Sequence, residues 1–200
     1  MSILFKDRDG QTPITHEERQ GLKSKIIDTM GELDELEEKN IEKGLLWLRN
    51  KKTIELEDVL SSSFLCELHK KLFGDVWDWA GRYRTTARNI GVDHYNIHKE
   101  LNDLFENVKT WIEYQSYSNA EIIARFHHKL VYIHPFPNGN GRTSRILTNE
   151  LSLLIAGTSP SWQRSVSPKE RRETYIKALR AADDRKYEYM IEYFKEVDNT

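Results

Sequence analysis

Cysteine is nearly absent from this 200-residue chain, and long apolar runs are missing. The single cysteine, Cys66, excludes an internal disulfide framework and is typical of a reducing compartment, so we expect a cytoplasmic protein. No apolar run approaches the length that crosses a bilayer, which predicts no membrane partner. The first residues are apolar only from Ile3 to Phe5 before charges begin, and this pattern does not resemble a signal peptide.

An excess of charge of one sign is also missing. The chain holds 30 Lys and Arg against 32 Asp and Glu, a formal net charge of -2. Nucleic-acid-binding domains usually concentrate Lys and Arg into a basic surface, so this balance predicts no nucleic-acid partner. The length is sufficient for one domain with its own core, and no internal repeat or low-complexity run divides the chain.

Apolar residues recur at helical spacing along most of the chain, which predicts an all-α fold of roughly six to nine helices. The helical patterns cover residues 24–49, 56–73, 97–114, 120–133, 142–155 and a segment that begins at Ser167 and Pro168. Gly157 is predicted to end the fifth of these helices, and Trp162 to turn inward from the loop that follows. The acidic cluster at 32–38 is typical of a solvated helix face, although dimerisation or capture of a partner are alternatives.

A short loop separates the helical patterns 120–133 and 142–155. Pro135 disfavours α geometry at His134 and so predicts the end of the first helix there. Gly139 and Gly141 supply backbone positions without a Cβ just before the second helix begins. Backbone N–H groups and a positive helix terminus would surround a small concavity, which is a typical binding site for phosphate.

Charged and titratable side chains border the same loop. Arg142 and Arg145 are three residues apart in the first turn of the second helix, so both guanidinium groups can reach one anion. His134 at the start of the loop has a side chain that can accept a proton from a hydroxyl near neutral pH. Each feature alone is common on protein surfaces, and the prediction of a site rests on their combination. A metal site from His127, His128 and His134 is disfavoured, because adjacent helical residues point about 100° apart.

The run HPFPNGNGRTSR at residues 134–145 resembles the signature of the Fic family, His-x-Phe-x-Asp/Glu-Gly-Asn-Gly-Arg-x-x-Arg. It matches at every specified position except one, because Asn138 stands where the family has an acidic residue. Residues 73–81, FGDVWDWAG, are similar to a second family segment, Phe-Gly-x-Val-x-x-Trp-Ala-Gly. The resemblance implies a Fic-type helical domain at 55–200 with a small β-hairpin flap, preceded at 1–54 by an irregular lead-in and a helical extension.

The resemblance also implies a function: a protein adenylyltransferase (AMPylase) that moves AMP from ATP to a Ser, Thr or Tyr hydroxyl of a target protein. His134 would be the general base, and Arg145 would orient the γ-phosphate. The α- and β-phosphates would be held by Gly139, Asn140, Gly141 and Arg142. Asn138 stands at the position that holds Mg²⁺ (or Mn²⁺). Since an amide oxygen lacks the charge of a carboxylate, we expect weaker metal binding and reduced transfer.

Two further sets of residues are implied by the family. The residues that correspond to the flap, which would bind the target, are Thr86, Arg88, Asn89, Ile90, Gly91 and Val92. Thr and Val favour strand, so an extended target segment could add to an exposed edge here, although an ordinary surface hairpin is the alternative. Tyr175 and Asp183 would border the adenine pocket.

Three alternatives remain open from the sequence. Asn138 could mark a catalytically weak or inactive nucleotide-binding or regulatory module. Some relatives, such as Doc, phosphorylate their targets with ATP reversed, but Doc carries Lys at the position of Gly141. Many family members are inhibited by a helix with the motif Ser/Thr-x-x-x-Glu-Gly/Asn, and no stretch here matches it, since Glu32 precedes Leu33 and Gln20 precedes Gly21. Inhibition by a separate antitoxin is therefore a further possibility.

Overall fold

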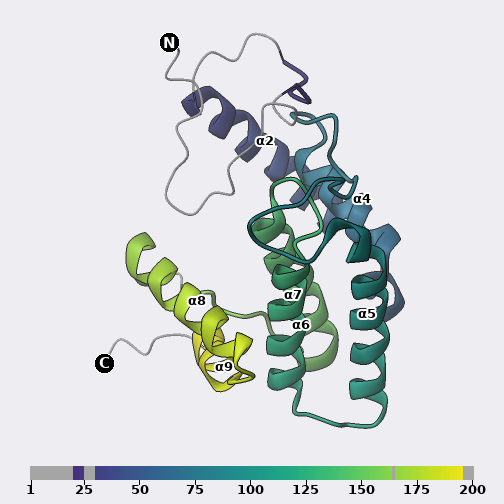
Figure 1. The fold of residues 1–200 in the computed structure, drawn as a ribbon, viewed down its shortest axis with the longest axis vertical. Helices are drawn as coiled ribbons and strands as arrows, with labels where there is room; N and C mark the ends of the chain where they lie inside the picture. The colour runs from purple at the N-terminus through teal and green to yellow at the C-terminus, as the bar shows by residue number, and fades with distance from the viewer. Residues whose placement is uncertain (1–19, 25–29, 164, 196–200) are drawn as a thin grey trace.

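The computed structural model describes residues 20–24, 30–163 and 165–195, which are built mainly from α-helices (Figure 1). In chain order these are α2 (Met30–Arg49), α3 (Leu56–Val59), α4 (Ser62–Phe73), α5 (Ile97–Glu113), α6 (Asn119–Ile133), α7 (Asn140–Ala156), α8 (Pro168–Asp183) and α9 (Glu188–Phe194), with a 3-10 turn, η1 (His94–Asn96), before α5. Within the described ranges there is no strand, only an isolated bridge between Leu22 and Trp77. The all-α prediction is confirmed, while most of the expected lead-in at 1–23 lies outside the described residues.

Helices α6 and α7 form the centre of the molecule (Figure 1). Helix α5 packs along α6, α2 packs on α4, and α8 and α9 pack on each other and on α6. The apolar faces that meet between these helices are fully buried, as at Phe126 and Leu130 of α6 and Leu147 and Leu151 of α7. Since each of these side chains is removed from water, their burial contributes about 1.5–3 kcal/mol apiece to folding. The rigid α6–α7 pair carries the loop at 134–139 at one end.

The ends of several helices follow the predictions from local sequence. Helix α6 ends at Ile133, α7 ends one residue before Gly157 at φ 72°, and the Ser167 hydroxyl accepts the Glu170 N–H at 3.3 Å to cap α8. Trp162 is buried, as predicted, and its indole N–H donates to the Asn149 side-chain oxygen at 2.8 Å.

The pattern at 56–73 predicted one helix, and the structure has two. Helix α3 ends at Val59, and Leu60 adopts φ -94° and ψ 43°, which does not continue an α-helix. Ser61 then starts α4, because its hydroxyl accepts the Phe64 N–H at 3.2 Å and donates to the Asp58 carbonyl at 2.8 Å. Apolar periodicity survives the break because both helices face the same core.

The predicted β-hairpin flap is wrong for the described structure, in which residues 83–93 contain no strand. Arg84 gives the physical reason. Its guanidinium is buried and donates to the carbonyls of Thr86, at 3.0 Å, and of Val92. These carbonyls lie near the two ends of the segment, where a hairpin would pair them with N–H groups of the opposite strand. One side chain with five donors satisfies them instead, so the backbone folds around it without forming a ladder.

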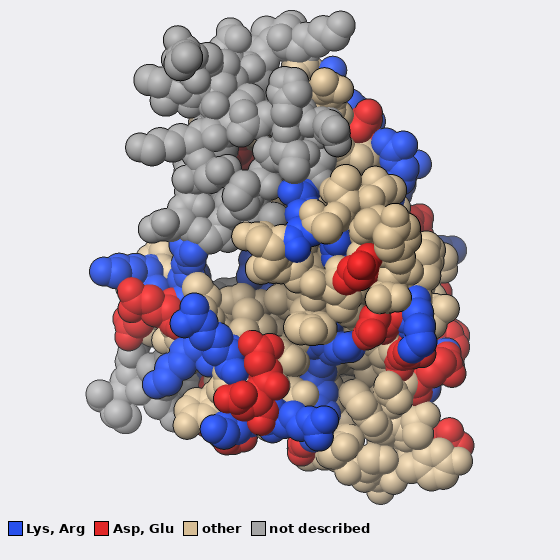
Figure 2. All heavy atoms as spheres, in the orientation of Figure 1, with Lys and Arg blue, Asp and Glu red and all other residues tan. Residues whose placement is uncertain are grey.

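Charged residues of both signs are interleaved over the face shown in Figure 2. Lys and Arg do not gather into one continuous area on this face, in keeping with the balanced composition. Among the described residues, no helix combines the length and apolar character needed to span a membrane.

Candidate active site

The α6–α7 loop is held in one shape by its own side chains. His134 ends α6 in the left-handed region, at φ 53° and ψ 60°, and the chain then turns through Pro135. The Asn140 side chain bridges back across the loop, accepting the Phe136 N–H at 2.9 Å and donating to the Phe136 carbonyl at 2.8 Å. Gly139 enters α7 at φ 76°, where a Cβ would lie 2.6 Å from the Phe73 ring. A residue other than glycine would therefore clash at this position.

His69 of α4 supports the loop from beneath. Its Nδ1 accepts the Gly81 N–H at 2.9 Å, so its other ring nitrogen, Nε2, carries the proton and donates to the Asn138 carbonyl at 3.0 Å. The ring stacks on Phe136 with centroids 3.7 Å apart. Burial lowers the pKa of His69 to about 3, which keeps this hydrogen-bond pattern at neutral pH. His69 thus joins the segment at 73–81 to the motif at 134–145, a role that sequence reasoning missed.

His134 lies at the rim of the loop in a nearly buried position, with 7% of its surface exposed. Burial, together with the positive charges of Arg84 and Arg88, lowers its pKa to about 4. The imidazole also donates to the Val131 carbonyl. A neutral imidazole has one N–H, so when that group binds Val131 the other ring nitrogen keeps its lone pair. The side chain is therefore in the state that a general base requires at neutral pH.

The segment at 83–93 lies directly against His134. Arg84 donates from Nε to the His134 carbonyl at 2.7 Å and from its backbone N–H to the Pro135 carbonyl at 2.9 Å. Gly91 has φ +93°, and a Cβ there would lie 2.7 Å from the His134 Cβ. Arg88 reaches the Pro137 carbonyl at 3.3 Å. Of the predicted flap residues, Arg88 and Gly91 are thus packed on the motif loop, Val92 donates its N–H to the Ile133 carbonyl at 3.4 Å, and Ile90 is about half exposed.

The side chains of the two motif arginines point from α7 toward different neighbours. Arg142 forms an ion pair with Glu37 of α2 at 2.7 Å and stacks over the Phe73 ring at 4.6 Å. The second carboxylate oxygen of Glu37 accepts the Trp77 indole N–H at 2.7 Å. Arg145 lies instead toward α8, 6.0 Å from the centre of the Tyr175 ring. No local pattern in the sequence indicates that Glu37, 105 positions before Arg142, forms an ion pair with the Arg142 guanidinium.

The position expected to hold a metal is poorly equipped for one. The Asn138 side-chain oxygen accepts the N–H of Gly139 at 2.5 Å, and its backbone carbonyl accepts from His69. Within residues 20–24, 30–163 and 165–195, no group of three or more His, Cys, Asp or Glu side chains could hold a metal ion. Mg²⁺ prefers carboxylate ligands, so these residues do not fit a metal held by the protein alone.

The two residues expected near adenine have their polar atoms engaged by α6. The Tyr175 hydroxyl bonds Nε2 of His127 at 2.8 Å, and the Asp183 carboxylate pairs with Nε2 of His128 at 2.9 Å. His127 and His128 thus point to different partners. Whether Tyr175 and Asp183 border a base stays a prediction.

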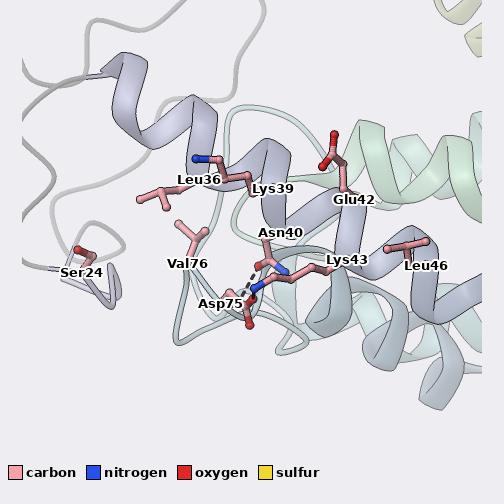
Figure 3. Close-up of a pocket in the computed structure, with 9 residues that line it drawn as sticks. All are labelled: Ser24, Leu36, Lys39, Asn40, Glu42, Lys43, Leu46, Asp75 and Val76. Carbon is pink, nitrogen blue, oxygen red and sulfur yellow. Dashed lines mark hydrogen bonds and ion pairs between the residues drawn. The ribbon is translucent and has the colours of Figure 1, made fainter.

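A pocket of about 430 Å³ opens elsewhere, along α2 (Figure 3). Its lining residues are Ser24, Leu36, Lys39, Asn40, Glu42, Lys43, Leu46, Asp75 and Val76. Lys43 pairs with Asp75 at 2.7 Å, and the Asn40 side chain accepts the Asp75 N–H at 2.7 Å. None of the residues at 134–145 lines this pocket, so it is separate from the candidate active site.

The fold and the loop define a helical protein in which a glycine-containing loop joins two central helices and a neutral histidine lies at the start of that loop. A family model described as "Fic/DOC family" matches residues 59–152. Together with the fold and the relatives described next, this match shows that the chain belongs to the Fic/DOC family. The resemblance stated from residues 134–145 and 73–81 is confirmed.

The curated relatives named here are longer than this chain. "Protein adenylyltransferase Fic" of Drosophila grimshawi is 32% identical over 180 residues, which cover 87% of this chain and 34% of that protein. The chain therefore spans about a third of the length of the curated relatives it matches. Among solved structures, the N-terminal Fic domain of a Bartonella effector protein from Bartonella sp. AR 15-3 superposes with a TM-score of 0.71 at 21% identity, covering 92% of this chain and 93% of that one. BepC from Bartonella tribocorum, solved with bound AMPPNP, superposes with a TM-score of 0.69 at 20% identity over 90% of this chain and 96% of that one.

Proposed function

We propose that this protein is a protein adenylyltransferase, which transfers AMP from ATP to a Ser, Thr or Tyr hydroxyl of a target protein. The observation that carries the proposal is the placement of a neutral His134 next to a loop that ends in the N-terminus of α7 and two arginines. The names of the Drosophila relatives and the AMPPNP in the BepC structure support it. From the residues themselves, 134–145 predict phosphate binding with a base beside it, and transfer of AMP is what the resemblance to the Fic family implies.

The loop and α7 supply the electrostatic part of the mechanism. ATP would lie with its α- and β-phosphates at the positive end of the helix, on the N–H groups of Asn140 and Gly141 and, once the Asn138 side chain releases it, on that of Gly139. Arg142 and Arg145 would offset the charge that builds up on the leaving pyrophosphate. The N–H groups at the α7 terminus are fixed by the helix and can stabilise the transition state without reorganising, whereas Arg142 would first have to turn away from Glu37.

His134 supplies the proton transfer. Its unprotonated nitrogen accepts the hydroxyl proton as the target oxygen forms a bond to the α-phosphorus. The bond between the α-phosphorus and the oxygen that bridges to the β-phosphate breaks, and pyrophosphate leaves. The pKa of about 4 means that the imidazole is neutral over the whole physiological range, although a weaker base also provides less driving force for proton transfer.

A divalent cation would have to be held largely by the nucleotide. Mg²⁺ bound to substrate phosphates usually has one or two protein carboxylates as additional ligands, and Asn138 provides none. We expect slower transfer than in family members with an acidic residue at this position.

The target would approach over the segment at 83–93, since this segment covers His134. Residues 85–87, 89–91 and 93 of this segment are exposed, so a partner can reach them in this conformation. Because no strand is present, addition of a target strand would require Arg84 to release the carbonyls of Thr86 and Val92.

A second candidate function is a nucleotide-binding or regulatory module with little turnover. The ion pair between Glu37 and Arg142 favours it, because a carboxylate already binds a guanidinium that phosphate would need. Activation would then depend on a partner or a conformational change, and an antitoxin could reinforce the inhibited state. Phosphate transfer from a reversed ATP, as in Doc, is less favoured because Gly141 provides no lysine.

The test uses ATP labelled at the α- or the γ-phosphate, Mg²⁺ or Mn²⁺, and a cell lysate as the source of targets. Label transferred only from the α-position supports adenylyl transfer, and His134→Ala should reduce it at least about 100-fold. His98→Ala, which removes an exposed histidine from α5, is the matched control and should transfer normally. Label from the γ-position would replace the proposal with phosphorylation. Nucleotide binding without any label would favour the second candidate.

A further inference from the structure

A chain of buried polar side chains runs behind the active-site loop, from α7 through α6 to α8. Nδ1 of His127 lies 2.9 Å from the Thr148 hydroxyl, and Nε2 of His127 lies 2.8 Å from the Tyr175 hydroxyl. The side chains of His127 and Thr148 have no exposed surface. Neither residue belongs to the signature at 134–145, and the mechanism above uses neither.

The direction of each hydrogen bond in this series of side chains follows from the bond that the Thr148 hydroxyl makes. The Thr148 hydroxyl donates its single proton to the Ser144 carbonyl at 2.7 Å, so toward His127 it can only accept. His127 must then carry its proton on Nδ1, which leaves Nε2 as an acceptor. The Tyr175 hydroxyl therefore donates to Nε2. Burial, together with the charge of Arg145, lowers the pKa of His127 to about 3, which keeps the ring neutral and this order intact.

The chain ends at Arg145. With its proton committed to His127, the Tyr175 oxygen keeps its lone pairs for other donors, and the Arg145 guanidinium carbon lies 6.0 Å from the centre of the Tyr175 ring, close enough for the guanidinium to interact with that oxygen. Aromatic rings enclose the same region, since the Tyr193 ring lies 5.4 Å from that of Tyr175 and the Trp162 ring 4.9 Å from that of His127. A long, flexible side chain is thus held on the α8 side of the loop.

We propose that Tyr175 and His127 are positioning residues, which fix the Arg145 guanidinium for the terminal phosphate of the bound nucleotide. The proposal rests on the proposed function, since it deepens the role of Arg145 within that site. Arg142 and the loop N–H groups serve the phosphates nearer to the sugar. Loss of the Tyr175 hydroxyl should therefore affect the binding of ATP, which has a γ-phosphate, far more than the binding of ADP.

The test measures ATP and ADP affinity by titration calorimetry for the full chain and for Tyr175→Phe, which removes one oxygen and keeps the ring. We expect ATP affinity to fall about tenfold, the loss of roughly one charge-assisted hydrogen bond, and ADP affinity to change less than about twofold. Thr148→Val should move the ratio in the same direction, because it removes the acceptor that fixes the His127 proton. In an Arg145→Ala background, Tyr175→Phe should have no further effect on the ratio.

Tyr193→Phe is the matched control. It removes a hydroxyl from the same aromatic cluster but not from the hydrogen-bonded series Thr148–His127–Tyr175, so it should keep the wild-type ratio of ATP affinity to ADP affinity. An equal loss of ATP and ADP affinity in Tyr175→Phe would mean a merely structural role and would overturn the proposal. So would an unchanged ratio. If the wild-type chain binds neither nucleotide, the proposed function itself fails, and the positioning role fails with it. Nitrogen-15 spectra of His127 provide a check without nucleotide: a protonated Nδ1 supports the assigned order, and a protonated Nε2 contradicts it.

Discussion

Replacing Glu37 with Gln should increase the affinity of the protein for ATP. The Glu37 carboxylate binds two donors, the buried Trp77 indole N–H and Arg142 Nη1, each at 2.7 Å. Each donor binds a different carboxylate oxygen, and a glutamine keeps only one oxygen, so its NH₂ group would face the other donor. The oxygen should stay with Trp77, because that donor has no access to water, while Arg142 is about one-third exposed and can turn away. Glu37→Gln therefore frees the arginine and preserves the contact in the core.

The size of the effect follows from two estimates. A partly buried charge-assisted hydrogen bond stabilises by about 1.5–3 kcal/mol, and in the wild type a phosphate must break or share this one. A phosphate oxygen on Arg142 would also lie roughly 5 Å from the carboxylate, and at an effective dielectric constant of about 20 two unit charges at that separation repel by about 3 kcal/mol. Solvent screening reduces the second figure, because Arg142 is partly exposed. If Glu37→Gln removes about 1–3 kcal/mol of this combined cost of binding, the affinity for ATP should rise by roughly 5- to 150-fold.

The assay is calorimetric titration with ATP of the wild type, Glu37→Gln and Glu38→Gln. Glu38 is exposed on the same helix, so its replacement makes the same change in net charge without touching Arg142. The gain should be confined to Glu37→Gln and should shrink as salt is added. Equal or weaker binding by Glu37→Gln, with thermal unfolding unchanged, would refute the reasoning and show that Glu37 orients Arg142 instead of competing for it.

Three further predictions follow from the same region. Asn138→Asp should raise the transfer rate most at low Mg²⁺, and an unchanged rate would contradict our account of that position. Gly91→Ala should displace the segment over His134, because the new Cβ would lie 2.7 Å from the His134 Cβ at φ +93°, and proteolysis of residues 83–93 should become faster. Acid should destabilise the fold, because His69 and His127 have pKa values of about 3 in the folded chain and 6.5 in the unfolded chain. Between pH 6.5 and 5 each histidine therefore binds a proton only in the unfolded chain. The free energy of unfolding, measured with urea, should fall by about 2 kcal/mol per histidine over this pH range.

Local sequence was sufficient wherever the structure depends on backbone preference. Pro135 and Gly139 bracket the loop as predicted, because proline and glycine restrict or extend φ at their own positions and at their neighbours. The same holds for Gly157 at the end of α7. These residues act within one or two positions along the chain, so no knowledge of the tertiary fold is required to interpret them.

Contacts between distant residues could not be predicted in this way. His69 meets Asn138 across 69 positions and Glu37 meets Arg142 across 105, and each contact depends on how α4 and α2 pack against the loop. The prediction of a β-hairpin flap was wrong for a related reason. Strand propensity at Thr86 and Val92 describes a backbone that pairs with another strand, whereas here the buried Arg84 guanidinium takes the carbonyls.

The two motif arginines are thus controlled from opposite sides, by helices that both lie outside the family-model match at 59–152. Helix α2 supplies the carboxylate on Arg142, and α8 supplies the hydroxyl on Arg145. Under the proposed function, the family segment would provide the loop and the base, and the flanking helices would determine how available each guanidinium is to phosphate. Since Glu37 and Tyr175 share no partner in the contacts described, the effects of Glu37→Gln and Tyr175→Phe on ATP affinity should add in the double variant to within about 0.5 kcal/mol. A larger coupling in calorimetry would mean that the arginines respond to each other, and that α2 and α8 do not act separately.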